Sequence, residues 1–261
     1  MNIKSFDMLG NIAIVKFPKG VRDNVKKKES LELLKNHNSV KTVLEKVGNF
    51  KGRLRKMKTK YIVGEKTKEV LYHENNCTFR FNIDSTYFSP RLSNERKEVA
   101  EMIKKNEVVL VMFAGVGPFS IVVAKNSNAK KVYSNELNRE ANKYGEMNIS
   151  LNKLKEKVEL VPGDIKRVAP ILKRKGMKFD VILMPRPQLK DSFLKEAFML
   201  SKKGTRIYYY DFCKEDEISG IVEMVKKEAL KCKKKIKIIK TKKAGELAPY
   251  KFRIRVDFVV L

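Results

Sequence analysis

The chain has few of the residues that support several common kinds of chemistry. It contains only three cysteines and two histidines in 261 residues. Cys77, Cys213 and Cys232 are far apart in sequence and lack the spacing of a metal site. With only His37 and His73, a His-based triad or a His-rich zinc site is disfavoured. We therefore expect no metal centre and a reducing compartment.

Long hydrophobic runs are also missing. No run of roughly 18 apolar residues occurs, so the sequence predicts no transmembrane helix. The N-terminal segment Met1-Asn2-Ile3-Lys4 lacks the apolar stretch of a secretory signal. We therefore expect a cytoplasmic protein without a membrane partner.

Acidic residues are scarce relative to basic ones. Lys and Arg number 58, Asp and Glu number 30, and the net charge is +28. A field of this sign attracts polyanions, of which nucleic acid is the usual one. A lysine-rich thermophilic surface is the alternative, but such surfaces are rich in Lys and Glu together. The charge balance therefore favours a nucleic-acid partner.

Length and patterning indicate a small unit followed by a large one. The first part reads as an α+β unit with a strand at 11–17, a helix at 22–46 and short strands at 61–63, 69–72 and 78–83. We predict a small domain for handling RNA and the target base over residues 1–80, and a larger domain over 81–261.

From Ser93 onward, strands and helices alternate strictly. The pattern predicts helices at 93–104, 118–126, 138–152, 166–175, 190–201 and 215–230, and strands at 107–112, 131–136, 157–161, 179–184, 205–211, 235–242 and 250–260. Alternation of this kind predicts a doubly wound, Rossmann-like α/β domain with a parallel sheet. The two consecutive strands at the end predict an antiparallel hairpin at the sheet edge.

A glycine-containing loop follows the first apolar strand of this domain. It reads Phe113-Ala114-Gly115-Val116-Gly117-Pro118-Phe119 and leads directly into a helix. Glycines allow a tight turn and a close approach to a ligand, and ligands of open α/β sheets bind at the carboxyl ends of strands. A plain βα turn is the alternative, and the loop alone does not decide between them.

Acidic residues end the next two strands. Glu136 can accept hydrogen bonds from both ribose hydroxyls of a nucleoside, and Asp164 can accept one from the exocyclic amine of an adenine. Ser120 replaces the last glycine of a dinucleotide fingerprint, and no Walker lysine follows the loop. An adenosine pocket without a pyrophosphate cradle indicates S-adenosylmethionine as the cofactor.

Two further segments indicate where the acceptor binds. The fourth strand ends in Pro185-Arg186-Pro187, where two prolines stiffen the backbone. Glu95 lies at the seam between the two units, where acceptors commonly bind. The alternatives are a proline strand stop and a first-turn acid favoured by the helix dipole. Together with the adenosine pocket, the segments favour an acceptor site.

These motifs resemble the archaeal and eukaryotic tRNA (guanine-N1)-methyltransferase family, which acts at position 37 beside the anticodon. The resemblance runs from about Phe6 to Leu261 and is carried by four blocks: Gly10 to Val15, Tyr87 to Leu92, Met112 to Phe119, and Ala248-Pro249 through Asp257-Phe258. It implies a class I methyltransferase fold, S-adenosylmethionine as methyl donor and the anticodon stem-loop of tRNA as partner.

The resemblance also implies residue roles. Glu95 would remove the proton from guanine N1, and Arg55 would donate to guanine O6, where charge develops. Pro185, Arg186 and Pro187 would border the methyl group and the target base. The cofactor would be held by Tyr87, Arg91, Phe113, Gly115, Gly117, Glu136, Asn138, Asp164 and Pro185.

Three departures from the family pattern keep alternatives open. Many relatives have an acid where Val111 stands, and many have Asn-Leu-Pro or Asn-Pro-Pro at 185–187. The separate domain with which the family grips the outer corner of tRNA is expected to be missing, and we expect a monomer. Some archaeal relatives methylate carbon 7 of a tricyclic wyosine precursor, and a related enzyme transfers an aminocarboxypropyl group. A catalytically inactive RNA-binding protein is the remaining alternative, which Glu95, Arg55 and the cofactor loop disfavour.

Overall fold

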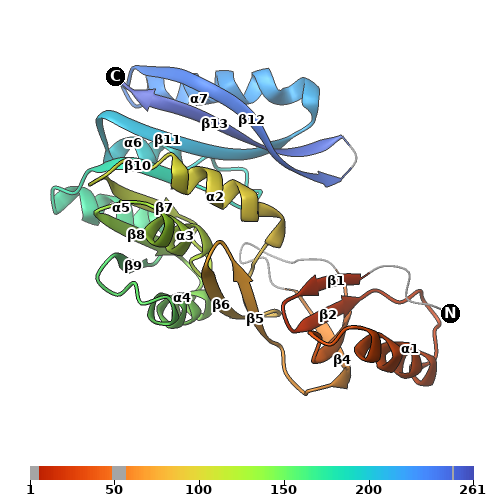
Figure 1. Ribbon diagram of the computed structural model, residues 1–261. Helices are drawn as coiled ribbons and strands as arrows, with labels where there is room; N and C mark the ends of the chain where they lie inside the picture. The colour runs from red at the N-terminus through yellow and green to blue at the C-terminus, as the bar shows by residue number, and fades with distance from the viewer. Residues whose placement is uncertain (1–5, 49–56, 249) are drawn as a thin grey trace.

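The structure is a computed structural model that describes residues 6–48, 57–248 and 250–261. Figure 1 shows a small N-terminal unit, a larger α/β unit and a two-stranded hairpin between them. The described part thus contains a 4-stranded sheet, a 7-stranded sheet and a 2-stranded sheet.

The small unit is one sheet covered by one helix. Its strands follow the order β1-β2-β3-β4, with β2 and β3 parallel. A compact core of Ala13, Val15, Leu33, Val43 and Val63 joins the helix to the sheet. The elements are β1 (Phe6–Leu9), β2 (Ile12–Val15), α1 (Asp23–Asn36), β3 (Thr42–Lys46) and β4 (Thr59–Gly64).

The prediction of one helix over 22–46 is wrong in its second half. Helix α1 ends at Asn36, and Thr42–Lys46 is a strand in the middle of the small sheet. The apolar positions of this segment fit a helix or a strand when read alone. The segment forms a strand because it pairs with β2 on one side and β4 on the other. This pairing satisfies the backbone hydrogen bonds of a largely buried segment.

The hairpin of β5 (Glu69–Glu74) and β6 (Cys77–Asn82) is fastened to the large unit by side-chain amides. Asn148 accepts from the backbone N–H of Arg80 at 2.7 Å and donates to its carbonyl at 3.0 Å. Asn152 does the same with Thr78, at 2.9 and 2.7 Å. Two helix amides thereby act as strand partners for β6 and satisfy its outer edge.

The large unit has the predicted doubly wound architecture. Its sheet order is β12-β13-β11-β10-β7-β8-β9, parallel except where β13 pairs antiparallel with β11 and β12. The predicted terminal hairpin is therefore confirmed. The strands are β7 (Val108–Met112), β8 (Lys131–Glu136), β9 (Val158–Pro162), β10 (Phe179–Met184), β11 (Ser201–Cys213), β12 (Ile236–Ala248) and β13 (Lys251–Val260).

Helices cover both faces of this sheet (Figure 1). They are α2 (Ser93–Glu101), α3 (Pro118–Asn126), α4 (Arg139–Leu151), α5 (Ile165–Arg174), α6 (Leu194–Leu200) and α7 (Ile218–Lys231), with 3-10 turns at Pro90–Leu92 and Glu215–Glu217. Helix α6 begins four residues later than predicted, so that 185–193 forms a loop. The sheet order reverses between β7 and β10, which is where ligands bind in such folds.

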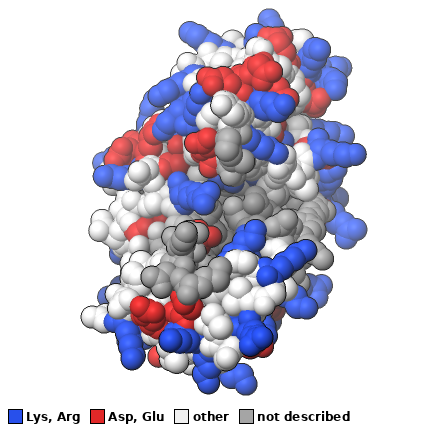
Figure 2. Space-filling view, turned by 90° about the vertical axis from the view of Figure 1, so that its right-hand side faces the viewer, with Lys and Arg blue, Asp and Glu red and all other residues white. Residues whose placement is uncertain are grey.

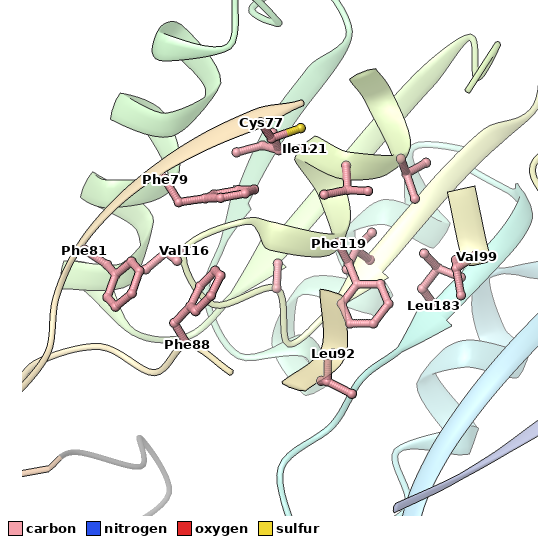
Figure 3. Close-up of a cluster of buried hydrophobic side chains, with 14 of the residues drawn as sticks. Cys77, Phe79, Phe81, Phe88, Leu92, Val99, Val116, Phe119, Ile121 and Leu183 are labelled. Carbon is pink, nitrogen blue, oxygen red and sulfur yellow. The ribbon is translucent and has the colours of Figure 1, made fainter. Parts of the chain in front are cut away.

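One core cluster connects the hairpin to the sheet. Figure 3 shows Phe79 and Phe81 of β6 beside Phe88, and Leu183 of β10 at the far end of the same cluster. The rings of Phe81 and Phe88 stack with centroids 4.7 Å apart. The segment that carries Phe88 is therefore held against the carboxyl ends of the strands by apolar packing.

Candidate active site

The loop after β7 has a backbone that few sequences tolerate. Phe113, Gly115 and Gly117 all have positive φ, at 60°, 59° and 89°. A positive φ is uncommon for a residue with a side chain, and such residues gather at functional sites. The ring of Phe113 packs edge-on against Phe193, with centroids 5.0 Å apart, which supports its conformation.

Glu136 joins the first two strand ends. Its carboxylate accepts from the backbone N–H of Gly115 and from that of Asn138, each at 2.7 Å. Asn138 caps α4 by accepting from Glu140 at 3.0 Å, and its amide donates to the Ser85 carbonyl at 2.8 Å. The carboxylate thus reaches from the end of β8 to the loop that follows β7, and Glu136 is half-buried.

The third strand end adds a second acid. Asp164 caps α5 by accepting from the backbone N–H of Lys166 at 3.1 Å. The preceding Gly163 donates to the Glu136 carbonyl at 2.8 Å, which ties the two strand ends together. Both acids therefore lie on one edge of the sheet, as the sequence predicts.

A pocket opens over these strand ends and brings most of the predicted residues together. Seven of the predicted cofactor residues line it: Tyr87, Phe113, Gly115, Glu136, Asn138, Asp164 and Pro185. Gly117 shapes the loop without lining the pocket, and Arg91 is exposed on the turn before α2. Arg55 lies outside the described residues.

Arg186 closes one wall of the pocket with its guanidinium already engaged. It donates to Asp211 at 2.5 Å and to the carbonyls of Leu189 at 2.9 Å, Pro187 at 3.2 Å and Asp191 at 3.2 Å. The side chain is 4% exposed. Arg186 therefore shapes the loop 185–193 beside the pocket.

Arg96 is a pocket residue that sequence reasoning missed. Its buried guanidinium donates to Glu74 at 2.6 Å and to the Ser89 carbonyl at 3.0 Å, and it lies 5.1 Å from the centroid of Phe88. It thereby links the hairpin to the segment that covers the pocket. No signal in the sequence pairs it with Glu74, because the partners are 22 residues apart and Arg is usually a surface residue of a helix.

Glu95, the residue before Arg96, is also buried in the first turn of α2. Its carboxylate accepts from the Tyr210 hydroxyl at 2.7 Å, pairs with the Arg255 guanidinium and lies 3.3 Å from the Lys242 ammonium. Burial, with the nearby Glu95 charge, raises the pKa of Tyr210 well above its ordinary value, so its hydroxyl remains a donor. Arg96 of the same helix and Leu92 just before it line the pocket, whereas Glu95 is not among the lining residues.

The described part of the chain offers neither a metal-binding cluster nor a membrane-spanning helix. No group of three or more His, Cys, Asp or Glu side chains there is arranged to hold a metal ion. No helix within the described ranges is long and apolar enough to cross a membrane.

A doubly wound sheet with a glycine loop and a carboxylate at the end of the second strand is the architecture of a nucleoside-binding class of enzymes. The family model described as the TRM5/TYW2 methyltransferase domain matches residues 70–239, and the TYW2 N-terminal domain matches residues 2–67. The chain belongs to the TRM5/TYW2 methyltransferase family, which confirms the family expected from the sequence.

Individual relatives are similar over nearly the whole chain. Trm5b of Pyrococcus abyssi, named a tRNA (guanine(37)-N(1))-methyltransferase, is 34% identical over 98% of this chain and 74% of its own. Its crystal structure has a TM-score of 0.84, covering 99% of this chain and 75% of that one. Taw22 of Nanoarchaeum equitans, named a tRNA (guanine(37)-N(1))/4-demethylwyosine(37)-methyltransferase, is 33% identical over 98% of this chain and 100% of its own.

A third relative was solved with part of a cofactor. The structure of Methanocaldococcus jannaschii Trm5 in complex with adenosine is 27% identical, with a TM-score of 0.80, and covers 98% of this chain and 72% of that one. Its ligand is of the class that the pocket chemistry indicates.

Proposed function

We propose that this protein transfers a methyl group from S-adenosylmethionine to N1 of guanosine at position 37 of tRNA. The observation that carries the proposal is that Gly115, Glu136 and Asp164 line the same pocket as the acceptor-side Pro185. The names of Trm5b and Taw22 support the same reaction.

The cofactor body would be held at the strand ends. Glu136 accepts hydrogen bonds from the backbone N–H groups of Gly115 and Asn138, which point its carboxylate into the pocket where ribose hydroxyls would donate to it. Asp164 would accept from the adenine amine. Bound S-adenosylmethionine supplies an electrophilic methyl group, and the residues here supply its orientation.

Glu95 and Arg55 would carry the acceptor chemistry. Neutral guanine is a poor nucleophile at N1 because that atom bears a proton. Glu95 would take the proton as the new bond from N1 to the methyl carbon forms and the sulfur–methyl bond breaks. Arg55 would donate to O6, where negative charge develops. Pro185, Arg186 and Pro187 would border the methyl group and the base.

Charge supports tRNA as the partner. The chain carries a net charge of +28, and Figure 2 shows many separate groups of Lys and Arg around one face, with patches of Asp and Glu among them. We propose that residues 1–80 handle the RNA and residues 81–261 the cofactor; the family models divide slightly earlier, between 67 and 70. We further propose that the enzyme reads the anticodon stem-loop and acts as a cytoplasmic monomer.

A second candidate is methylation of carbon 7 of the wyosine precursor, in addition or instead. The match to Taw22 over its whole length favours it, as does the Pro185-Arg186-Pro187 motif. Aminocarboxypropyl transfer is the third candidate, and the TYW2 N-terminal match over 2–67 favours it.

One experiment separates the three reactions. The protein is incubated with labelled S-adenosylmethionine and either unmodified tRNA or tRNA carrying the precursor, and the nucleosides are analysed by mass spectrometry. We expect a methyl increment on guanosine. A methyl increment only on the tricyclic base, or the larger aminocarboxypropyl increment, would replace the proposal by the corresponding alternative.

A further inference from the structure

A buried charged cluster joins α2 to the antiparallel end of the large sheet. Its centre is Arg255 of β13, whose side chain is 0% exposed. Asp257 holds this guanidinium with two contacts, Nε to Oδ1 at 2.7 Å and Nη2 to Oδ2 at 3.0 Å. The remaining guanidinium nitrogen, Nη1, pairs with Oε1 of Glu95. A chain of contacts thus runs from Asp257 through Arg255 to Glu95.

A second donor reaches the same oxygen from the neighbouring strand. The Tyr210 hydroxyl of β11 donates to Oε1 of Glu95 at 2.7 Å, and Tyr210 is fully buried. The other oxygen, Oε2, lies 3.3 Å from the ammonium of Lys242, whose side chain is 30% exposed. The two carboxylate oxygens therefore have different surroundings.

Stability alone gives a weak reason for this cluster. Removing two charges from water costs several kcal/mol per ion, and apolar residues of similar volume often stabilise a fold as well or better. An ion pair that is fully buried, with a second acid holding the arginine, instead fixes the geometry of the carboxylate at its end. The remaining titratable and charged groups around Glu95 are Glu98 on α2, Tyr208 on β11, Lys242 on β12 and Asp257 on β13.

We propose that Arg255 and Tyr210 are positioning residues that hold Oε1 of the Glu95 carboxylate, so that Oε2 is the atom that accepts the guanine proton. The proposal rests on the proposed N1 methylation with Glu95 as the base. It gives a role to Arg255 and Asp257 of the C-terminal block, neither of which lines the cofactor pocket. Among the described residues, Lys242 is the contact that must yield at Oε2, and its side chain is partly exposed.

The test compares single-turnover methylation by the wild type, Tyr210→Phe and Arg255→Lys across pH. Tyr210→Phe removes one donor without changing a charge, and Arg255→Lys keeps the charge but loses the fork geometry. Each should slow methylation by about tenfold or more at neutral pH, the effect of one hydrogen bond to a charged group. Because Oε1 loses a donor in Tyr210→Phe, the pH profile of the single-turnover rate should differ from that of the wild type.

A matched control addresses general damage to α2. Arg206 pairs with Glu107 at 2.5 Å and donates to the Met102 carbonyl just beyond the helix, 2.8 Å away. Arg206→Met should lower the melting temperature but leave the single-turnover rate within about threefold, well short of a general-base effect. If Arg255→Lys does not fold, Tyr210→Phe still decides the question.

Double variants separate this inference from the proposed function. In a Glu95→Gln background, Tyr210→Phe and Arg255→Lys should cause no further loss, because they act through the same carboxylate. Equal losses in both backgrounds, or a pH profile of Tyr210→Phe identical to that of the wild type, would overturn the positioning role even if Glu95→Gln itself is slow. A Glu95→Gln enzyme that keeps the wild-type rate would instead remove the proposed base.

Discussion

The Glu136 carboxylate accepts a 2.7 Å hydrogen bond from the backbone N–H of Gly115, 21 residues earlier in the chain. The bond links the end of the second strand to the turn after the first, where Gly115 has a φ of 59°. One acid therefore both stabilises the loop and faces the pocket. Loss of its charge should therefore both weaken the loop and remove an acceptor from the pocket.

Cofactor affinity should depend on Glu136. Glu136→Ala removes hydrogen bonds to a charged group, each contributing roughly 1.5–3 kcal/mol, so binding of S-adenosylmethionine should weaken at least about tenfold in calorimetry. Glu159→Ala, an exposed acid on the adjacent β9, is the matched control and should bind as the wild type does. Unchanged affinity in Glu136→Ala would remove this residue from the cofactor site.

Methylation should depend on Glu95 and Arg55. Glu95→Gln keeps the size of the side chain but cannot accept a proton as a carboxylate does, so single-turnover rates should fall by about 10²–10⁴. Arg55→Ala should cost about 10²–10³ through the lost O6 donor.

Both variants should still bind the cofactor in calorimetry, because neither residue is expected to hold the adenosine. A Glu95→Gln rate within about threefold of the wild type, with intact binding of tRNA and cofactor, would make Glu95 only a helix-start acid. Carbon-7 chemistry, in which no N1 proton has to leave, would then be favoured.

The Arg186–Asp211 pair should hold the acceptor loop. Asp211→Asn leaves a guanidinium that is 4% exposed without its charge partner, and breaking a buried pair in this way costs about 3–5 kcal/mol. Denaturant unfolding measures this loss. Lys226→Ala breaks the exposed pair with Glu223 at 2.7 Å and should cost less than about 1 kcal/mol. Similar losses in the two variants would show that the Arg186 contacts do not order the loop.

The Arg96–Glu74 pair should connect the hairpin to the cofactor pocket. Glu74→Gln removes the charge opposite the Arg96 side chain, which is 1% exposed. The free energy of unfolding, measured with denaturant, should therefore fall by about 3–5 kcal/mol. Because Arg96 also holds the Ser89 carbonyl beside the pocket, S-adenosylmethionine affinity should fall in parallel. If folded Glu74→Gln binds S-adenosylmethionine as tightly as the wild type does, the Arg96–Glu74 pair has only a structural role.

Binding of tRNA should depend steeply on salt. If about 6–10 phosphates are contacted, affinity should fall by about a thousandfold or more between low and moderate salt. Filter binding at several salt concentrations measures the slope, and an uncharged polymer of similar size serves as the control for non-electrostatic effects. A flat dependence would contradict RNA binding through the +28 charge.

The sequence by itself determined the large domain. Strict alternation of buried strands and amphipathic helices specifies a doubly wound sheet, because each pattern can bury its apolar face in only one way. Since parallel strands end at one edge, residues read directly after successive strands, such as Gly115, Glu136 and Asp164, had to meet there. Local pattern and chain order were sufficient for this part of the site.

Only the tertiary structure decided what depends on distant partners. Residues 42–46 become a strand because β2 and β4 flank them, although their apolar spacing also fits a helix. Arg255 meets Glu95 across 160 residues, and Arg96 meets Glu74 across 22, with no periodic signal in either case. In a sequence, isolated charged residues are expected on the surface. Only the packing of α2 against the hairpin and the last strands buries these side chains, and a buried charge needs an oppositely charged partner.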